Sequence, residues 1–187
     1  SFLYYPIIGH SVGSKVIFSE TKGLKICPDN ILEKITSKTS IIYLANPNNP
    51  TGSILYKKDL VRMLEKVPKH IIVVIDGAYA EFVEEDGFTD GIDLIESFPN
   101  VIITRTFSKI YALAGFRIGW AYSSIEIIEI LEKIRGPFNV NIIAQISASL
   151  IINNKKFLKK SISHNKKWRT WLINKINNIG LEALDSY

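Results

Sequence analysis

Four short, mostly apolar runs stand out along the chain, and each one ends in polar or turn-forming residues. They cover residues 40–44, 71–75, 101–103 and 117–121. Apolar runs of this length, without strict polar alternation, are typical of strands that are buried on both faces. We therefore predict four strands at these positions and a fifth, shorter one at 15–19, whereas residues 1–8 are rich in aromatics and show no period.

Between and after these runs, apolar residues recur every three or four positions, which is the pattern of amphipathic helices. This pattern begins at Asp29, covers 57–67, 139–152 and 157–179, and also follows Ser123. The Asp29 carboxylate can cap its helix by accepting from first-turn amides, and Ser123 begins a capping-box spacing. Helices that alternate with apolar strands predict an α/β fold, with a mainly parallel sheet covered on both faces.

The composition is that of a soluble globular protein, with 47% hydrophobic and 22% charged residues in 187. No apolar run reaches the length needed to span a membrane. Cys27 is the only cysteine, so the chain has neither a disulfide framework nor a thiolate metal cluster, and a reducing cytoplasm is the expected setting. The three histidines lack metal-ligand spacing, so we expect no metal site.

The net charge of +5 is unevenly distributed, because residues 133–180 hold ten Lys and Arg and no Asp or Glu. Such a basic segment can be a nucleic-acid footprint. It can also be the solvated face of amphipathic helices. We favour the second interpretation, since apolar residues recur at helical spacing through the same segment.

Three of the predicted strands end in residues that carry chemistry. These residues are Asn49, then Asp76 with Tyr79, and then the loop 106–109. In open α/β sheets, ligands bind outside the carboxyl ends of the strands, so an amide, a carboxylate, a phenol and an amine would meet at one edge. The glycine-rich motifs of dinucleotide and nucleoside triphosphate sites are absent from the sequence.

The loop 106–109 offers two hydroxyls and the Lys109 amine, and Arg117 follows eight positions later. Hydroxyl donors and a guanidinium suit a phosphate dianion. An amine beside that phosphate suggests a Schiff-base lysine, because neighbouring cations and desolvation favour the neutral, nucleophilic form. The same residues also fit ordinary surface charges that flank a turn, and Asp76 by itself fits a helix cap.

Pyridoxal phosphate needs all the groups that these strand ends supply. It requires a lysine for its aldehyde, a carboxylate for its pyridinium nitrogen, donors for its ring oxygen and a grip on its phosphate. Keeping the nitrogen protonated lets the ring accept the electron pair released at the substrate's α carbon. The residues therefore predict pyridoxal phosphate as the cofactor.

Three motifs together carry a family resemblance: Asn-Pro-Asn-Asn-Pro-Thr-Gly at 46–52, Asp-Gly-Ala-Tyr at 76–79, and 106–109 with Arg117. They resemble the class I/II aminotransferases of the aspartate aminotransferase superfamily, which have fold type I among the pyridoxal-phosphate enzymes. The likeness is greatest to the histidinol-phosphate aminotransferases and covers nearly the whole chain. It implies the large, cofactor-binding domain of that fold, a three-layer α/β/α structure, truncated here at both ends.

The resemblance also implies roles for individual residues. Lys109 would be the Schiff-base lysine that moves the proton between the α carbon and the cofactor, and Asp76 would pair with the pyridine nitrogen. Asn49 and Tyr79 would hydrogen-bond the ring oxygen. The phosphate would be held by Thr106, Ser108 and Arg117.

Two further features follow from the same resemblance. Phe2 lies where the family places the aromatic that stacks on the cofactor ring, although an aromatic there also fits the core. The peptide bond between Asn49 and Pro50 is expected to be cis. Gly77 stands where many relatives carry Glu, which we interpret as tolerable variation.

The implied reaction transfers the amino group of histidinol phosphate to 2-oxoglutarate. An aromatic aminotransferase or a threonine-phosphate decarboxylase-like enzyme would keep the same cofactor residues. A noncatalytic basic α/β binding module is the alternative from another class. The expected partners are a small-molecule amino donor, a 2-oxo acid and a second copy of the full-length protein, with neither nucleic acid nor membrane.

The resemblance also divides the chain. Residues 1–150 would form the partial pyridoxal-phosphate domain, and 151–187 a long helix leading to a small C-terminal domain. Because Met63 is the only methionine and Ser1 lies in an expected loop, we expect a fragment. Alone, it should lack transaminase activity, since the family's carboxylate-binding arginine would follow Tyr187.

Overall fold

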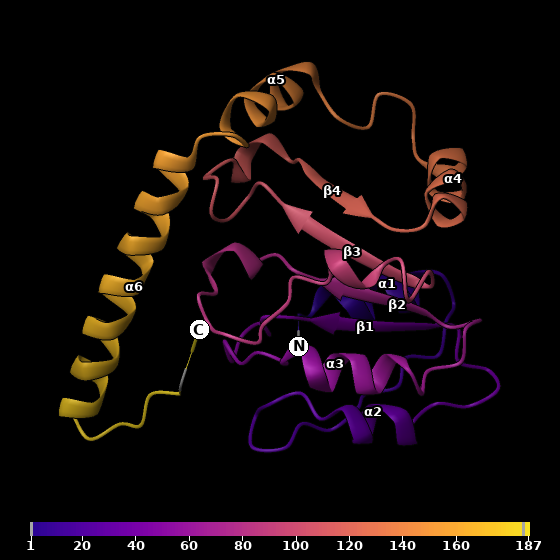
Figure 1. The fold of residues 1–187 in the computed structure, drawn as a ribbon, viewed down its shortest axis with the longest axis horizontal. Helices are drawn as coiled ribbons and strands as arrows, with labels where there is room; N and C mark the ends of the chain where they lie inside the picture. Colours follow the sequence, from indigo (N-terminus) through magenta and orange to yellow (C-terminus); the bar gives the residue numbers. More distant parts are fainter. Residues whose placement is uncertain (1, 185) are drawn as a thin grey trace.

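A four-stranded sheet forms the centre of the computed structural model, which describes residues 2–184 and 186–187 (Figure 1). The strands are β1 (Ile41–Ala45), β2 (Ile72–Asp76), β3 (Val101–Thr106) and β4 (Gly119–Tyr122), in the order β1-β2-β3-β4. The first three are parallel and β4 runs antiparallel to β3. The four predicted strands and the mainly parallel sheet are thus confirmed.

The fifth predicted strand is wrong. Residues 14–20 have no regular secondary structure, and Phe18 is 70% exposed. The apolar run at 15–19 resembles a strand, but a strand is stable only when its backbone groups pair with a neighbour. Within the described residues, this segment pairs with no strand of the sheet.

Six α-helices and three short 3₁₀ helices accompany the sheet in the described chain. The α-helices are α1 (Tyr4–Ser11), α2 (Pro28–Glu33), α3 (Lys57–Leu64), α4 (Ile125–Ile134), α5 (Ile142–Ile151) and α6 (Lys155–Asn178). The 3₁₀ helices are η1 (Ala80–Phe82), η2 (Ile92–Leu94) and η3 (Ala114–Phe116). Helix α1 was not predicted, because it buries none of its residues and so shows no apolar period.

Both side-chain caps that the sequence predicted are wrong. Helix α2 begins after Cys27 with Pro28 in its first turn, so Asp29 lies inside the helix and pairs with Arg62 at 3.3 Å. The Ser123 hydroxyl instead donates to the Val101 carbonyl at 2.6 Å, and Ser124 precedes the first residue of α4, Ile125. A short polar side chain can serve either a helix end or a neighbouring strand, and the local sequence does not distinguish the two.

The hydrophobic core lies between one face of the sheet and helices α2 and α3. Its fully buried side chains are Leu60, Met63, Ile71, Val73, Ile75, Val101 and Ile103. The opposite face is more open, since Ile41 and Tyr43 are 50% and 42% exposed. Helix α1 lies against that face through Tyr5, whose ring stacks on Tyr43 with a centroid distance of 5.1 Å.

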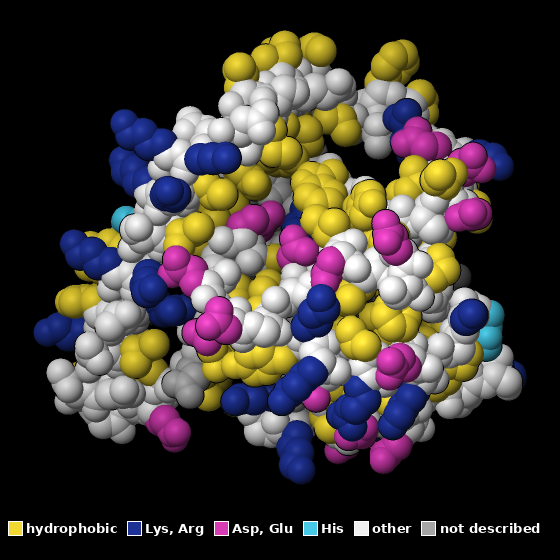
Figure 2. All heavy atoms as spheres, viewed as in Figure 1, with side chains coloured by type: hydrophobic (Ala, Val, Ile, Leu, Met, Phe, Trp, Pro, Cys, Tyr) yellow, Lys and Arg dark blue, Asp and Glu magenta, His cyan; other side chains and the backbone are white. Residues whose placement is uncertain are grey.

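The basic segment forms mainly helix α6, over which Figure 2 shows a concentration of Lys and Arg side chains. None of the described residues of this helix is buried, and Lys166 contacts Glu84 at 2.9 Å. Its lysines are therefore exposed, which both interpretations of the charge pattern expect. In the described part of the chain, no helix is both long and apolar enough to cross a membrane.

Candidate active site

The carboxyl ends of β1, β2 and β3 lie at one edge of the sheet. Asp76 is the last residue of β2 and is in register with Ala45 of β1 and Thr104 of β3. The turn after β1 is joined to β2 by a hydrogen bond from the Asn46 amide to the Asp76 carbonyl, at 2.9 Å. Since β3 ends at Thr106, the lysine loop leaves the sheet at the same edge.

The turn after β1 is held by the buried side chain of Asn46. Its Nδ2 donates to the Leu55 carbonyl at 3.1 Å, and its Oδ1 accepts from the Leu55 amide at 2.8 Å. The Asn49 amide, which lies in the same turn, donates to the Tyr79 hydroxyl at 3.5 Å. The Asn49–Pro50 bond is cis, as expected, and the Asn46–Pro47 bond is cis as well.

Tyr79 connects this turn to the lysine loop. Lys109 Nζ lies 5.2 Å from the centre of the Tyr79 ring, over its face. The electron-rich face of a phenol attracts a cation without forming an ion pair with it. The structure thus brings Asn49, Tyr79 and Lys109 together in one group.

The loop after β3 presents hydroxyls beside a guanidinium. The Ser108 amide donates to Thr106 Oγ1 at 3.0 Å, so these two residues form a small turn. Arg117 Nη1 donates to Ser108 Oγ at 3.4 Å and to the Ala114 carbonyl at 2.7 Å. Arg117 is exposed and has a φ of 56°. The group can present several N–H and O–H donors to an anion such as a phosphate.

The Asp76 carboxylate accepts two hydrogen bonds. Oδ1 accepts from the Ala78 amide at 3.1 Å, and Oδ2 accepts from the Tyr5 hydroxyl at 2.7 Å. Partial burial raises the pKa of the Tyr5 phenol, and the charge and hydrogen bond of Asp76 raise it further. Tyr5 was missed at the sequence level, where the aromatic-rich start of the chain was the only signal.

Phe2 lies next to this group. Its ring meets the Tyr5 ring edge to face, with a centroid distance of 5.7 Å and an interplanar angle of 82°. The side chain is 45% exposed. Tyr5 therefore contacts both Phe2 and Asp76.

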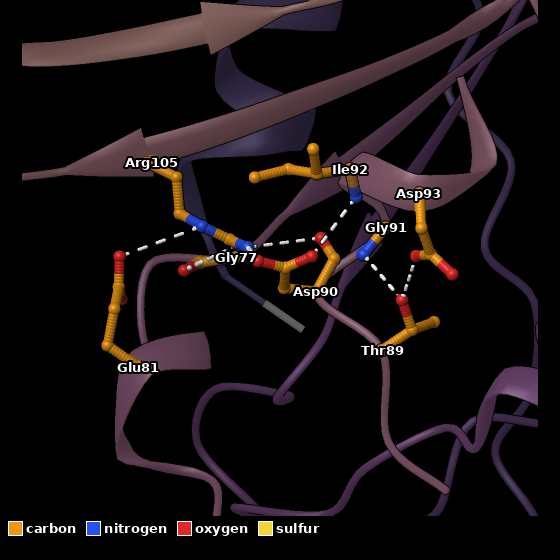
Figure 3. Close-up of polar contacts among 8 residues, drawn as sticks. All are labelled: Gly77, Glu81, Thr89, Asp90, Gly91, Ile92, Asp93 and Arg105. Atoms are coloured by element: carbon orange, nitrogen blue, oxygen red, sulfur yellow. Dashed lines mark hydrogen bonds and ion pairs between the residues drawn. The ribbon is translucent and has the colours of Figure 1, made fainter. Parts of the chain in front are cut away.

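A second polar cluster surrounds Arg105, which sequence reasoning also missed (Figure 3). Its side chain is 2% exposed and pairs with Glu81 at 3.6 Å and with Asp90 at 3.1 Å. The guanidinium also donates to the carbonyls of Gly77 and Asp90, both at 3.1 Å, and lies 5.9 Å from the centre of the Trp120 ring. The cluster therefore ties β3 to the turn that carries Asp76.

Gly77 has a physical role that the sequence did not reveal. A Cβ built at this position would lie 1.4 Å from Arg105 Nη1. The guanidinium therefore occupies the space that any other side chain would need. The absence of a side chain at this position allows Arg105 to pack beside the Asp76 turn.

Among the described residues, in contrast, the two cationic groups of the candidate site have no carboxylate partner. Within the described chain, neither Lys109 nor Arg117 forms an ion pair, and Asp76 pairs with no cation. In the same part of the chain, no cluster of His, Cys, Asp and Glu could hold a metal. The edge thus presents an acid, an amine and a guanidinium that, among the described residues, have no ion-pair partner.

The chain is similar to known proteins over nearly its whole length. A model of the family "Aminotransferase class I and II" matches residues 3–187. The histidinol-phosphate aminotransferase of Rhodopseudomonas palustris (strain BisB18) is 40% identical over 185 residues, which are 99% of this chain and 51% of that protein. That of Pelagibacter ubique (strain HTCC1062) is 42% identical over 165 residues, 88% of this chain and 46% of that protein.

A solved structure agrees in fold. The histidinol-phosphate aminotransferase from Sinorhizobium meliloti, in complex with pyridoxal-5'-phosphate, superimposes with a TM-score of 0.90 at 29% identity. The match covers 98% of this chain and 49% of that one. The expected fold, the large domain of the fold type I transferases, is thereby confirmed, and the chain spans about half the length of the relatives that it matches.

Proposed function

We infer the function of this chain from its family, because the chain belongs to the aminotransferases of class I and II. We propose that the whole protein is a pyridoxal-phosphate-dependent aminotransferase that uses histidinol phosphate as amino donor and 2-oxoglutarate as acceptor. The names of the relatives at 40% and 42% identity support this choice of donor. The solved relative in complex with pyridoxal-5'-phosphate supports the cofactor.

One arrangement carries the proposal. Asp76 and the Lys109 loop lie at the carboxyl ends of two adjacent parallel strands, and the Lys109 amine lies over the Tyr79 ring. A single pyridine ring can contact a carboxylate with its nitrogen and an amine with its aldehyde only if both groups lie at the same edge of the sheet.

The chemistry of the residues fits the cofactor group by group. Asp76 would pair with the protonated ring nitrogen, and Asn49 with Tyr79 would hydrogen-bond the ring oxygen. Phe2 would stack on the ring. The phosphate would be bound by Thr106, Ser108 and Arg117. When bound, pyridoxal phosphate supplies an electron sink for the carbanion formed at the α carbon of an amino acid.

Lys109 would have two roles in this site. It would bind the cofactor aldehyde covalently, and it would take and return the proton at the substrate's α carbon. Both roles need the neutral amine for part of the cycle, and an adjacent carboxylate would oppose this by favouring the charged form. The absence of such a partner among the described residues fits both roles.

Titration with pyridoxal phosphate of the natural polypeptide that contains this chain tests the cofactor. We expect a visible absorption band of the lysine-bound cofactor that sodium borohydride reduces to a stable adduct on Lys109. The variant Lys109→Ala should lack both the band and the adduct. Lys159→Ala, which alters an exposed lysine of α6, should retain them. A chain that gives no band, or binds nucleic acid instead with strong salt dependence, would contradict the proposal.

The amino donor is tested with the natural polypeptide that contains this chain. Glutamate formation from 2-oxoglutarate is measured with histidinol phosphate and with aromatic amino acids, and decarboxylation is measured with threonine phosphate. We expect the highest kcat/KM with histidinol phosphate. A preference for an aromatic amino acid would contradict the choice of donor and leave the cofactor assignment intact.

We also propose that the whole protein is a homodimer in the cytoplasm. Exposed apolar side chains on α5, among them Ile142, Ile146 and Leu150, support a partner surface. The single cysteine fits a reducing compartment. Light scattering of the natural polypeptide should give twice the mass of one chain, and a monomeric mass would contradict the homodimer.

A further inference from the structure

Three contacts converge on Tyr5, the residue that links α1 to the candidate site. Its hydroxyl donates to Asp76 Oδ2 at 2.7 Å. Its ring stacks on Tyr43 of β1, with a centroid distance of 5.1 Å and an interplanar angle of 21°. The Phe2 ring meets it edge to face at 5.7 Å. One side chain thus contacts an acid of the site, the sheet, and the aromatic that flanks the site.

We propose that Tyr5 is a positioning residue of the cofactor site. Its hydroxyl orients the Asp76 carboxylate toward a ring nitrogen, and its ring positions Phe2 through their edge-to-face contact. The proposal rests on the proposed function, because it assumes that Asp76 meets the nitrogen of pyridoxal phosphate. It adds a residue that lies outside the motifs of the family resemblance.

The two hydrogen bonds of Asp76 determine the plane of its carboxylate. A carboxylate attached to a single Cβ rotates unless its oxygens are held. The Ala78 amide holds Oδ1 from within the turn, and Tyr5 holds Oδ2 from 71 residues earlier in the sequence. Each oxygen can accept a second hydrogen bond, so either can still pair with a protonated nitrogen.

Tyr5 acts as a permanent donor. Burial and the neighbouring Asp76 charge raise the pKa of its phenol above the ordinary value, so the hydroxyl keeps its proton throughout the physiological range. A donor to an ionised acceptor makes a stronger hydrogen bond than a neutral pair does. The contact can therefore hold the carboxylate in one orientation before the cofactor arrives.

The same residue couples Phe2 to Asp76. Helix α1 buries none of its described residues, so its position depends on few contacts. Of the hydrogen bonds made by its side chains in the described structure, only that of Tyr5 reaches the sheet, since Ser11 bonds within the helix. A change at Tyr5 should thus disturb both the acid and the aromatic of the site.

The substitution Tyr5→Phe tests the proposal, because it removes the hydroxyl and keeps the ring that stacks on Tyr43. The natural polypeptide is loaded with pyridoxal phosphate, and the dissociation constant and the circular dichroism of the visible cofactor band are measured. Without the Tyr5 hydroxyl, the Asp76 carboxylate must be ordered when the ring nitrogen binds, and the cost of ordering one side chain predicts up to about tenfold weaker binding. The dichroism should weaken as well, since it reports how rigidly the ring is held.

Two comparisons separate positioning from a general structural effect. Tyr4→Phe alters the neighbouring, exposed tyrosine of the same helix and should leave both readouts unchanged. An analogue of pyridoxal phosphate with carbon in place of the ring nitrogen has no partner for Asp76. With this analogue, the difference in affinity between Tyr5→Phe and the parent should shrink to less than about threefold, whereas a general loss of structure would persist.

The outcomes distinguish this inference from the proposed function. If the parent polypeptide forms no lysine-bound cofactor, the proposed function fails and the inference fails with it. If the parent binds the cofactor and Tyr5→Phe behaves like Tyr4→Phe, only the role of Tyr5 is refuted. An equal loss with the cofactor and with its carbon analogue would also refute a role through Asp76.

Discussion

Arg105 and Lys109 are two cations only four positions apart, yet the structure treats them in opposite ways. The Arg105 side chain is 2% exposed and pairs with two carboxylates, whereas Lys109 is exposed and meets the face of the Tyr79 ring. A buried charge is tolerated only with close partners, and a nucleophilic amine must remain without them. The comparison separates a charge that holds the fold from one that is available for chemistry.

The alternation of side chains along β3 accounts for the difference. Val101, Ile103 and Arg105 are buried and point to the same face of the strand, so the arginine lies in line with the core. Lys109 follows after the strand has ended at Thr106, where no such alternation applies. A shift of one residue in the register of β3 would therefore move Arg105 from the buried face of the strand to its opposite face.

The largest expected effect comes from removing the buried cation. Arg105→Met leaves Glu81 and Asp90 without their shared partner and should lower the free energy of unfolding by about 3–5 kcal/mol. Lys109→Met should change it by less than about 0.5 kcal/mol, because this exposed amine forms no ion pair with any described residue. Urea unfolding of both variants measures the contrast, and equal losses would contradict it.

Gly77→Ala should have the next largest effect on stability. The new methyl group would collide with Arg105 Nη1, so the guanidinium must leave its ion pairs, and we expect a loss of about 2–3 kcal/mol. In an Arg105→Met background, the same change should cost much less, because the colliding atom is absent. Additive losses in a double-mutant cycle would show that Arg105 is not the cause.

Arg117→Met tests the candidate active site, to which Lys109 also belongs. We expect about tenfold weaker binding of pyridoxal phosphate, since a charged hydrogen-bond donor to the phosphate is lost. Binding of pyridoxal, which lacks the phosphate, should be unchanged. Arg62→Met is the control, because that guanidinium pairs with Asp29 and lies outside the candidate site.

The smallest expected effect is a pH dependence of the free energy of unfolding, which arises from Glu81 in the cluster around Arg105. Burial raises the pKa of Glu81, although the Arg105 charge opposes the shift. The folded state therefore favours the protonated form, so the contribution of Glu81 to stability is fully present below its unfolded pKa of about 4.5 and is lost as the pH rises through the raised value. Relative to the parent, Glu81→Gln should become more stable across this window in urea unfolding. A constant difference between pH 4 and 8 would contradict the shift.

The candidate site was predictable where short local motifs carry it. Asp76 and Lys109 follow apolar runs, and Asn49 lies in a dense cluster of Pro, Asn and Gly. Short apolar runs leave a strong sequence signal, so the strand ends could be located to within one to three residues. The caps at Asp29 and Ser123 failed, since one polar residue fits several local structures.

Tyr5 and Arg105 were not predictable, because their contacts join distant parts of the chain. Tyr5 bonds a residue 71 positions away, and Arg105 bonds Gly77 across 28 positions. No periodic pattern records such contacts, and a charged residue inside an apolar strand gives no sign of its partners. Gly77 could be understood only after Arg105 was located beside it.

The sequence by itself determined which groups stand at the strand ends, since strand periodicity and turn chemistry are local properties of the chain. Only the tertiary structure decided which charges are neutralised. Whether a cation is neutralised depends on the side chains that packing brings near it, and these come from elsewhere in the sequence. For this reason, Arg105 became part of the scaffold and Lys109 remained open to a ligand.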